Sequence, residues 1–100
     1  MDLESLRDQI DRIDKEIISR LNERVCLAQK VGHLKLKEGK PIYVPSREEE
    51  VFRKLTSNNQ GPLNDKAIRA IYREVISAAI ASEKALKVAY LGPEGTYTHQ

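Results

Sequence analysis

Apolar residues recur at helical spacing along the first third of the chain. Counting from Leu3 at about 100° per residue, one set of positions falls within an arc of roughly 80°. We call this set the stripe, and two cations interrupt its apolar members toward the end: Leu3, Leu6, Ile10, Ile13, Ile17, Leu21, Arg24, Ala28, Val31 and Lys35. Asp2 can cap the start of such a helix, and Gly39 followed by Pro41 provides a stop. The pattern predicts one helix of about 35 residues.

The predicted length of this helix has a structural consequence. At 1.5 Å per residue it would be roughly 50 Å long. A compact domain of 100 residues is much narrower than that. The helix therefore needs neighbours along its whole length.

Two further helices follow. Ser46 precedes Glu49 by three residues, the spacing of a capping box, which predicts a helix over the segment SREEEVFRKLTS. A third helix is expected from near Asn64, with apolar and small residues at helical spacing: Ile68, Ile71, Tyr72, Val75, Ala78, Ala79, Ser82 and Leu86. Its small residues allow a neighbouring backbone to approach closely. Tyr72 is interpreted as a core residue.

The end of the chain differs in pattern. The segment VAYL, residues 88–91, is typical of a short strand, and GPEGTYTHQ after it is glycine-rich turn sequence. A strand at the end of this chain cannot pair alone, so residues 88–100 are expected to be mobile or loosely docked. The pattern indicates the opening of another domain.

Composition narrows the class of protein. With 100 residues, 32% of them charged and only 5% aromatic, the chain is expected to form one small all-α domain. Its net charge of +2 arises from 17 basic and 15 acidic residues, which gives no single-sign field for a nucleic acid or an anionic membrane. Cys26 is the single cysteine, the segment MDLESLRDQI lacks the apolar run typical of a signal peptide, and no apolar run of roughly 18 residues occurs. A cytoplasmic protein without a membrane span is expected.

Arg24 and Lys35 are the candidate functional residues of the stripe. They lie only about 20° apart around the helix axis, on a face otherwise dedicated to burial. Cations near an apolar seam commonly reach its rim and stay solvated, which is the alternative interpretation. Burying either cation without an anion would cost several kcal/mol. Because Ala28 and Val31 lie between them, the two cations flank a small gap suited to a compact dianionic ligand.

Arg7 suggests a second chain. It lies roughly 25 Å from Arg24 along the helix and about 100° around it, so one small ligand cannot touch both on the same helix. In an antiparallel dimer of the long helices, Arg7 of one subunit could approach the gap of the other. Such a dimer would also cover the long helix.

The segments LRDQIDRIDKEIISRLNERVCLAQKVGHLK, KPIYVPSREEEVFRKL and IYREVISAAIASE together resemble the all-helical chorismate mutases, in particular the N-terminal domain of bifunctional chorismate mutase/prephenate dehydratases. The closing VAYLGPEGTYTHQ resembles the start of the dehydratase domain. This resemblance implies a mutase domain over residues 1–87 and a truncated dehydratase domain over 88–100. It also implies three helices per chain in an intertwined homodimer that converts chorismate to prephenate, without a metal or cofactor.

The resemblance also implies roles for particular residues. Arg24, together with Arg7 of the partner subunit, would bind the two carboxylates of chorismate, and Lys35 would donate toward the ether oxygen and a nearby carboxylate. Glu48 would accept from the substrate hydroxyl beside Arg47, although a solvated first helical turn is the alternative for this pair. Glu83 would be the second donor at the ether oxygen, where other family members place a glutamine. A carboxylate only accepts hydrogen bonds, so Glu83 must be protonated to help.

Two positions depart from the family pattern. Val44 stands where some relatives carry an aspartate, and Ala79 where some carry a serine. The side-chain contacts of those relatives are therefore absent, and the expected contribution of Val44 is through its backbone.

Two other functions remain open. The long helix could be a dimerisation rod that tethers a downstream domain without catalysis, for which apolar residues at positions 24 and 35 would be expected. The helices could instead bind a regulatory amino acid, but these residues give that hypothesis no support. The cations at both stripe positions favour the enzyme.

Overall fold

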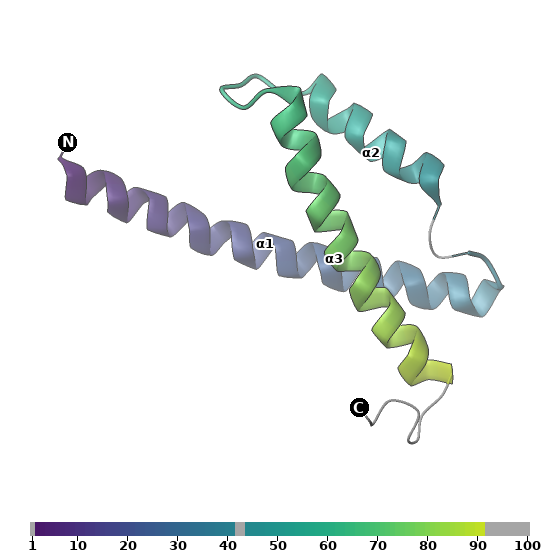
Figure 1. Cartoon of the computed structure of the whole chain (residues 1–100). Coiled ribbons are helices and arrows are strands. Elements are labelled where there is room, and N and C mark those ends of the chain that lie inside the picture. The colour runs from purple at the N-terminus through teal and green to yellow at the C-terminus, as the bar shows by residue number, and fades with distance from the viewer. Residues whose placement is uncertain (1, 42–43, 92–100) are drawn as a thin grey trace.

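The computed structural model describes residues 2–41 and 44–91, with residues 84–91 described by their backbone alone. It contains three helices, α1 (Leu3–Glu38), α2 (Pro45–Ser57) and α3 (Asp65–Leu91), joined by short loops (Figure 1). No strand occurs in the two described ranges. The predicted all-α class is confirmed.

Both ends of α1 lie where the sequence predicts them. The Asp2 carboxylate accepts a hydrogen bond of 2.8 Å from the backbone N–H of Ser5, which satisfies one of the unpaired donors of the first turn. Gly39 adopts the left-handed conformation, with φ of 70°, and ends the helix there. Helix α1 therefore spans 36 residues.

The start of α2 corrects the predicted capping box. Val44 is the N-cap residue, Pro45 occupies the first turn, and no side chain caps the helix. Ser46 lies inside the helix instead of at its boundary. The physical reason is that the fixed φ of proline suits the first helical position, where its missing N–H removes a donor that would have no partner.

The third helix begins as predicted but ends later. The Asn64 side chain accepts a hydrogen bond of 2.7 Å from the backbone N–H of Ala67, which makes it the cap of α3. The helix continues to Leu91, so the strand predicted for residues 88–91 is wrong. Those four residues continue the helical register of α3. Residues 92–100, expected to form a turn, lie outside the described residues.

Helix α3 lies between the other two helices and contacts both (Figure 1). Where it crosses α1, Gly32 is buried and the Gln29 side chain donates a hydrogen bond to the Ser82 hydroxyl. Ala79 of α3 and Phe52 of α2 are the buried apolar side chains among the described residues. The small residues at the crossing let the two backbones approach, as predicted from the segment SAAIAS.

The N-terminal half of α1 extends away from α2 and α3 (Figure 1). Its stripe is consequently open to solvent, with Ile10 56%, Ile13 56% and Ile17 47% exposed. The radius of gyration is 17.5 Å, whereas a compact domain of this length has a value of about 13 Å. A single chain therefore leaves a large apolar surface uncovered.

None of the described helices has a stretch apolar enough and long enough to cross a lipid bilayer. The cytoplasmic location expected from the sequence stays a prediction.

Candidate active site

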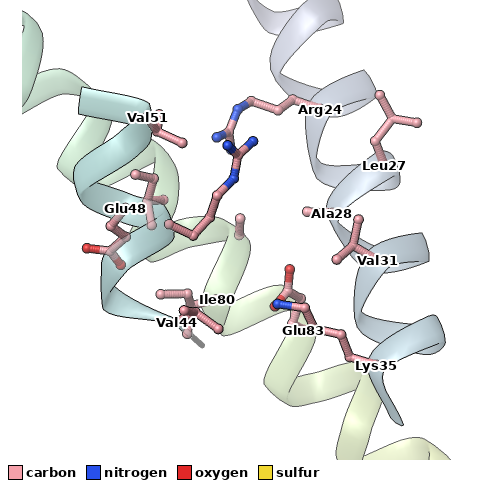
Figure 2. A pocket seen from close by; sticks show the side chains of 13 residues that line it. Arg24, Leu27, Ala28, Val31, Lys35, Val44, Glu48, Val51, Ile80 and Glu83 are labelled. Atoms are coloured by element: carbon pink, nitrogen blue, oxygen red, sulfur yellow. The ribbon is translucent and has the colours of Figure 1, made fainter. Parts of the chain in front are cut away.

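A cavity of about 290 Å³ lies between the C-terminal half of α1, the start of α2 and the second half of α3 (Figure 2). Six of the seven predicted site residues line it: Arg24, Lys35, Val44, Arg47, Glu48 and Glu83. The remaining wall is apolar and is formed by Leu27, Ala28, Val31, Val51, Ile76, Ala79 and Ile80. The tertiary structure thus gathers residues that are up to 59 positions apart in the sequence, counted from Arg24 to Glu83.

Arg24 and Lys35 stand at two ends of the α1 wall. Both side chains are half-buried, and 11 residues, or roughly 16 Å of helix, separate them. Figure 2 shows Arg24 reaching from α1 toward α2, while Lys35 and Glu83 lie together at the opposite end. The two cations flank Ala28 and Val31, which is the arrangement predicted from the stripe.

Helix α2 brings Arg47 and Glu48 to the cavity, and its N-cap residue Val44 also lines it. The Nη1 atom of Arg47 donates to Oε1 of Glu50 over 2.8 Å, so this guanidinium already has one carboxylate partner. The Glu48 side chain is half-buried, and in Figure 2 its carboxylate is turned away from Arg24 and Lys35. A ligand hydroxyl in the cavity would therefore meet this carboxylate after a rotation of the Glu48 side chain.

Glu83 is the carboxylate that α3 brings to the cavity. Partial burial against α1 raises the pKa of Glu83, because leaving water disfavours the charged form. The positive charges of Lys35 and Arg24 act in the opposite direction and favour ionisation, but they do not overcome the effect of burial. Glu83 is therefore easier to protonate than an ordinary glutamate.

Arg7 does not reach the cavity of its own chain. It is exposed on the N-terminal part of α1, 17 residues before Arg24, which corresponds to roughly 25 Å along the helix. The structure of one chain therefore places six of the predicted residues together and leaves the seventh apart.

Tyr72 was interpreted from the sequence as a core residue, and the structure gives it a different place. It is half-buried on α3, and its ring centroid lies 5.6 Å from Cζ of Arg24. Helical spacing identified the buried face that carries Tyr72. No pattern in the sequence predicts that this ring contacts an arginine 48 positions away.

The cavity combines charge with an apolar floor. Three cations, Arg24, Lys35 and Arg47, face two carboxylates, so the lining is net positive even when both acids are ionised. Fixed N–H donors beside an apolar wall are suited to binding a small anion and to stabilising negative charge that develops on an oxygen atom. Among the described side chains, no group of three or more His, Cys, Asp and Glu residues is arranged to hold a metal ion.

Comparison with known proteins agrees with this geometry. The chain is 50% identical over 103 residues to a bifunctional chorismate mutase/prephenate dehydratase of Aquifex aeolicus, covering 99% of this chain and 28% of that protein. The relative of the same description from Neisseria gonorrhoeae is 45% identical over 94 residues, covering 94% of this chain and 25% of that protein. The chain thus spans about a quarter of the length of the curated relatives it matches.

Solved structures are also similar. A chorismate mutase (form II) from Thermus thermophilus superposes with a TM-score of 0.80 at 39% identity, covering 82% of this chain and 93% of that one. A chorismate mutase from Helicobacter pylori in complex with prephenate gives a TM-score of 0.77 at 34% identity, covering 85% of this chain and 93% of that one. Residues 6–84 match the family described as chorismate mutase type II, and this range includes α2, most of α1 and α3, and every residue that lines the cavity. This chain belongs to the type II chorismate mutase family.

Proposed function

We propose that this chain catalyses the rearrangement of chorismate to prephenate, as the mutase part of a longer bifunctional protein. The observation that carries the proposal is the convergence of Arg24, Lys35, Arg47 and Glu83 in one cavity. Similarity to a mutase solved with prephenate supports the substrate class. The relatives described as bifunctional support a dehydratase domain that follows α3.

The rearrangement of chorismate requires the protein to position the substrate and to supply charge. In a Claisen rearrangement, a carbon–oxygen ether bond breaks while a carbon–carbon bond forms within the same molecule, so no group is transferred to the enzyme. The protein contributes by holding the flexible dianion in its reactive chair and by placing donors at the ether oxygen, where negative charge develops. The convergent cations of the cavity are suited to both tasks.

Arg24 and Lys35 have different roles in binding the dianion and in donating to the ether oxygen. The planar guanidinium of Arg24 suits bidentate binding of a substrate carboxylate, whereas the compact ammonium of Lys35 suits a single oxygen. Lys35 and Glu83 lie at the same end of the cavity (Figure 2), so both can address the ether oxygen. Glu83 can donate only when protonated, and the raised pKa of Glu83 supports this role.

Helix α2 closes the cavity over the rest of the substrate. Glu48 accepts a hydrogen bond from the substrate hydroxyl after its side chain turns inward. Arg47 adds positive charge beside it while Glu50 holds one of its N–H donors. Val44 supplies an apolar contact and a backbone position at the rim.

The functional unit in this proposal is an intertwined homodimer. A partner that lies along α1 would cover the exposed stripe residues Ile10, Ile13 and Ile17, which one chain leaves open. The same packing would bring Arg7 of each subunit to the cavity of the other, where it would bind the second carboxylate. The exposed stripe also supports the alternative of a non-catalytic dimerisation rod that tethers a dehydratase domain.

A direct assay separates the enzyme from the rod. The purified 100-residue chain is expected to consume chorismate, measured as loss of its absorbance, with saturable kinetics. Arg24→Ala and Lys35→Ala are each expected to abolish measurable turnover while the protein stays folded and dimeric, because these charges serve the ligand. A native chain that leaves chorismate unchanged would refute the proposal, and loss of the dimer in either variant would favour the rod.

A further inference from the structure

Arg24 stands in the wall between two cavities. Besides the candidate active site, it lines a second cavity of about 430 Å³ between α1 and α3. Five apolar residues, Ile13, Ile17, Leu21, Ile71 and Val75, border that cavity, and Glu16, Arg20 and Tyr72 complete its lining beside Arg24. In the proposed dimer the partner helix would cover this second cavity at Ile13 and Ile17. An arginine side chain has several rotatable bonds, so its orientation toward the active site depends on a residue of its own chain that contacts it.

Tyr72 is in a position to restrain Arg24. Cζ of Arg24 lies over the tyrosine ring at 5.6 Å from its centroid, within the range in which a ring face attracts a cation. Tyr72 borders the second cavity and is absent from the lining of the active-site cavity. It therefore touches the arginine from the side away from the proposed substrate.

This kind of restraint leaves the arginine ready to bind. Arg47 shows the alternative, since its Nη1 atom is already engaged by the Glu50 carboxylate at 2.8 Å. A ring face attracts the positive charge but accepts none of the in-plane hydrogen bonds that a carboxylate accepts. Arg24 can thus be held by Tyr72 and still offer its N–H donors to a substrate.

We propose that Tyr72 is a positioning residue for the mutase reaction. It holds the Arg24 guanidinium in the orientation that binds a substrate carboxylate. The inference rests on the proposed function. Loss of the ring would lower the fraction of enzyme with Arg24 in place, and the apparent affinity for substrate falls by the same factor. The expected effect therefore falls on KM and leaves kcat nearly unchanged.

Two substitutions at position 72 test the ring itself. Tyr72→Leu removes the ring and keeps an apolar side chain, and it is expected to raise KM for chorismate by about two- to fivefold, with kcat nearly unchanged. Tyr72→Phe keeps the ring and removes only the hydroxyl, so its KM should match that of the native chain. A raised KM in Tyr72→Phe, or an unchanged KM in Tyr72→Leu, would overturn the proposal.

The chain offers a matched control. Cζ of Arg69 lies 5.2 Å from the ring centroid of Phe52, a second cation–ring contact between α3 and α2 that borders neither cavity. Arg69→Gln removes that contact and is expected to keep the native KM. If Arg69→Gln raised KM as much as Tyr72→Leu, the effect would belong to general loosening of the helices and the positioning role would fail.

A spectroscopic measurement gives a readout besides activity. In ¹⁵N-labelled protein, the Nε–Hε resonance of Arg24 is assigned by its disappearance in Arg24→Lys. Because the ring face shields protons above it, this resonance is expected to move to higher frequency in Tyr72→Leu and to stay near its native position in Tyr72→Phe. An unmoved Hε resonance in Tyr72→Leu would overturn the proposal.

A second variant covers the case in which Tyr72→Leu does not form the native assembly. Pentafluorophenylalanine at position 72 keeps an aromatic ring but no longer presents a negative face, and it should raise KM as the leucine does. Native kinetics with the fluorinated ring would refute the positioning role alone. A native chain without turnover would instead refute the proposed function itself, whatever the resonance of Arg24 shows.

Discussion

Gly32 of α1 lies directly against the Glu83 side chain of α3. A Cβ atom built on this buried glycine would be 3.7 Å from Cγ and 3.8 Å from Cδ of the glutamate. One turn earlier, the Gln29–Ser82 hydrogen bond ties the same two helices together. The close crossing keeps water from one side of the Glu83 carboxyl, which is the physical cause of its raised pKa.

Gly32→Ala tests this relationship. The added methyl group meets Glu83 at ordinary van der Waals distance, so the helices need not separate, and it displaces water from the carboxyl. We expect the pKa of Glu83 to rise further and the alkaline limit of mutase activity to move to higher pH. Alanine should also stabilise α1 by up to about 1 kcal/mol, measured by thermal unfolding. The control compares Glu83→Gln with and without Gly32→Ala, and the two pH profiles should be the same because no titrating carboxyl remains at position 83.

Glu83→Gln tests the protonated donor directly. Since the pKa of Glu83 is raised, the donor form is populated at acidic pH and is lost as the pH increases through that pKa. Activity of the native chain should therefore be greatest at mildly acidic pH and decline toward alkaline pH. A glutamine donates at every pH, so pH profiles of kcat/KM should show this decline removed in the variant. Identical profiles for the two proteins would rule out the role given to Glu83.

Mixed dimers test whether Arg7 serves the partner subunit. Arg7→Ala and Arg24→Ala homodimers should each be inactive, because every site lacks one arginine. A heterodimer of the two places both losses in one site and leaves the other intact. Equal mixing after unfolding and refolding should give about a quarter of the native number of sites, measured as kcat per total chain. If mixing restores no activity, the sites are not shared between subunits.

A charge placed on the stripe tests the proposed dimer. Ile13 is 56% exposed in one chain, and a partner along α1 would bury it. Ile13→Glu should therefore yield a monomer by sedimentation and lose mutase activity, because a buried unpaired carboxylate costs several kcal/mol. Lys15→Glu introduces the same side chain two positions away, on the opposite side of α1, and should remain an active dimer. A dimeric Ile13→Glu variant would exclude the stripe as the interface.

The sequence by itself determined the elements that depend on near neighbours. The cap at Asp2, the stop at Gly39 and the start at Asn64 were all predicted, because caps act within one helical turn. The same reasoning failed at Ser46, because Pro45 opens the helix and the N-cap is Val44, two residues earlier. It also failed for residues 88–91, whose strand-like composition did not outweigh the continuing helix. Both errors lie at helix boundaries, where competing local preferences are close in energy.

Only the tertiary structure decided how the helices register against one another. Periodicity placed Arg24 and Lys35 on one face of α1, and the family resemblance suggested their partners. The crossing of α1 and α3 is what brings Glu83 to Gly32 and Tyr72 to Arg24. These pairs are 51 and 48 positions apart, so no local pattern encodes them. Their register follows from packing small residues at the crossing, which is a property of two surfaces together and not of either sequence segment alone.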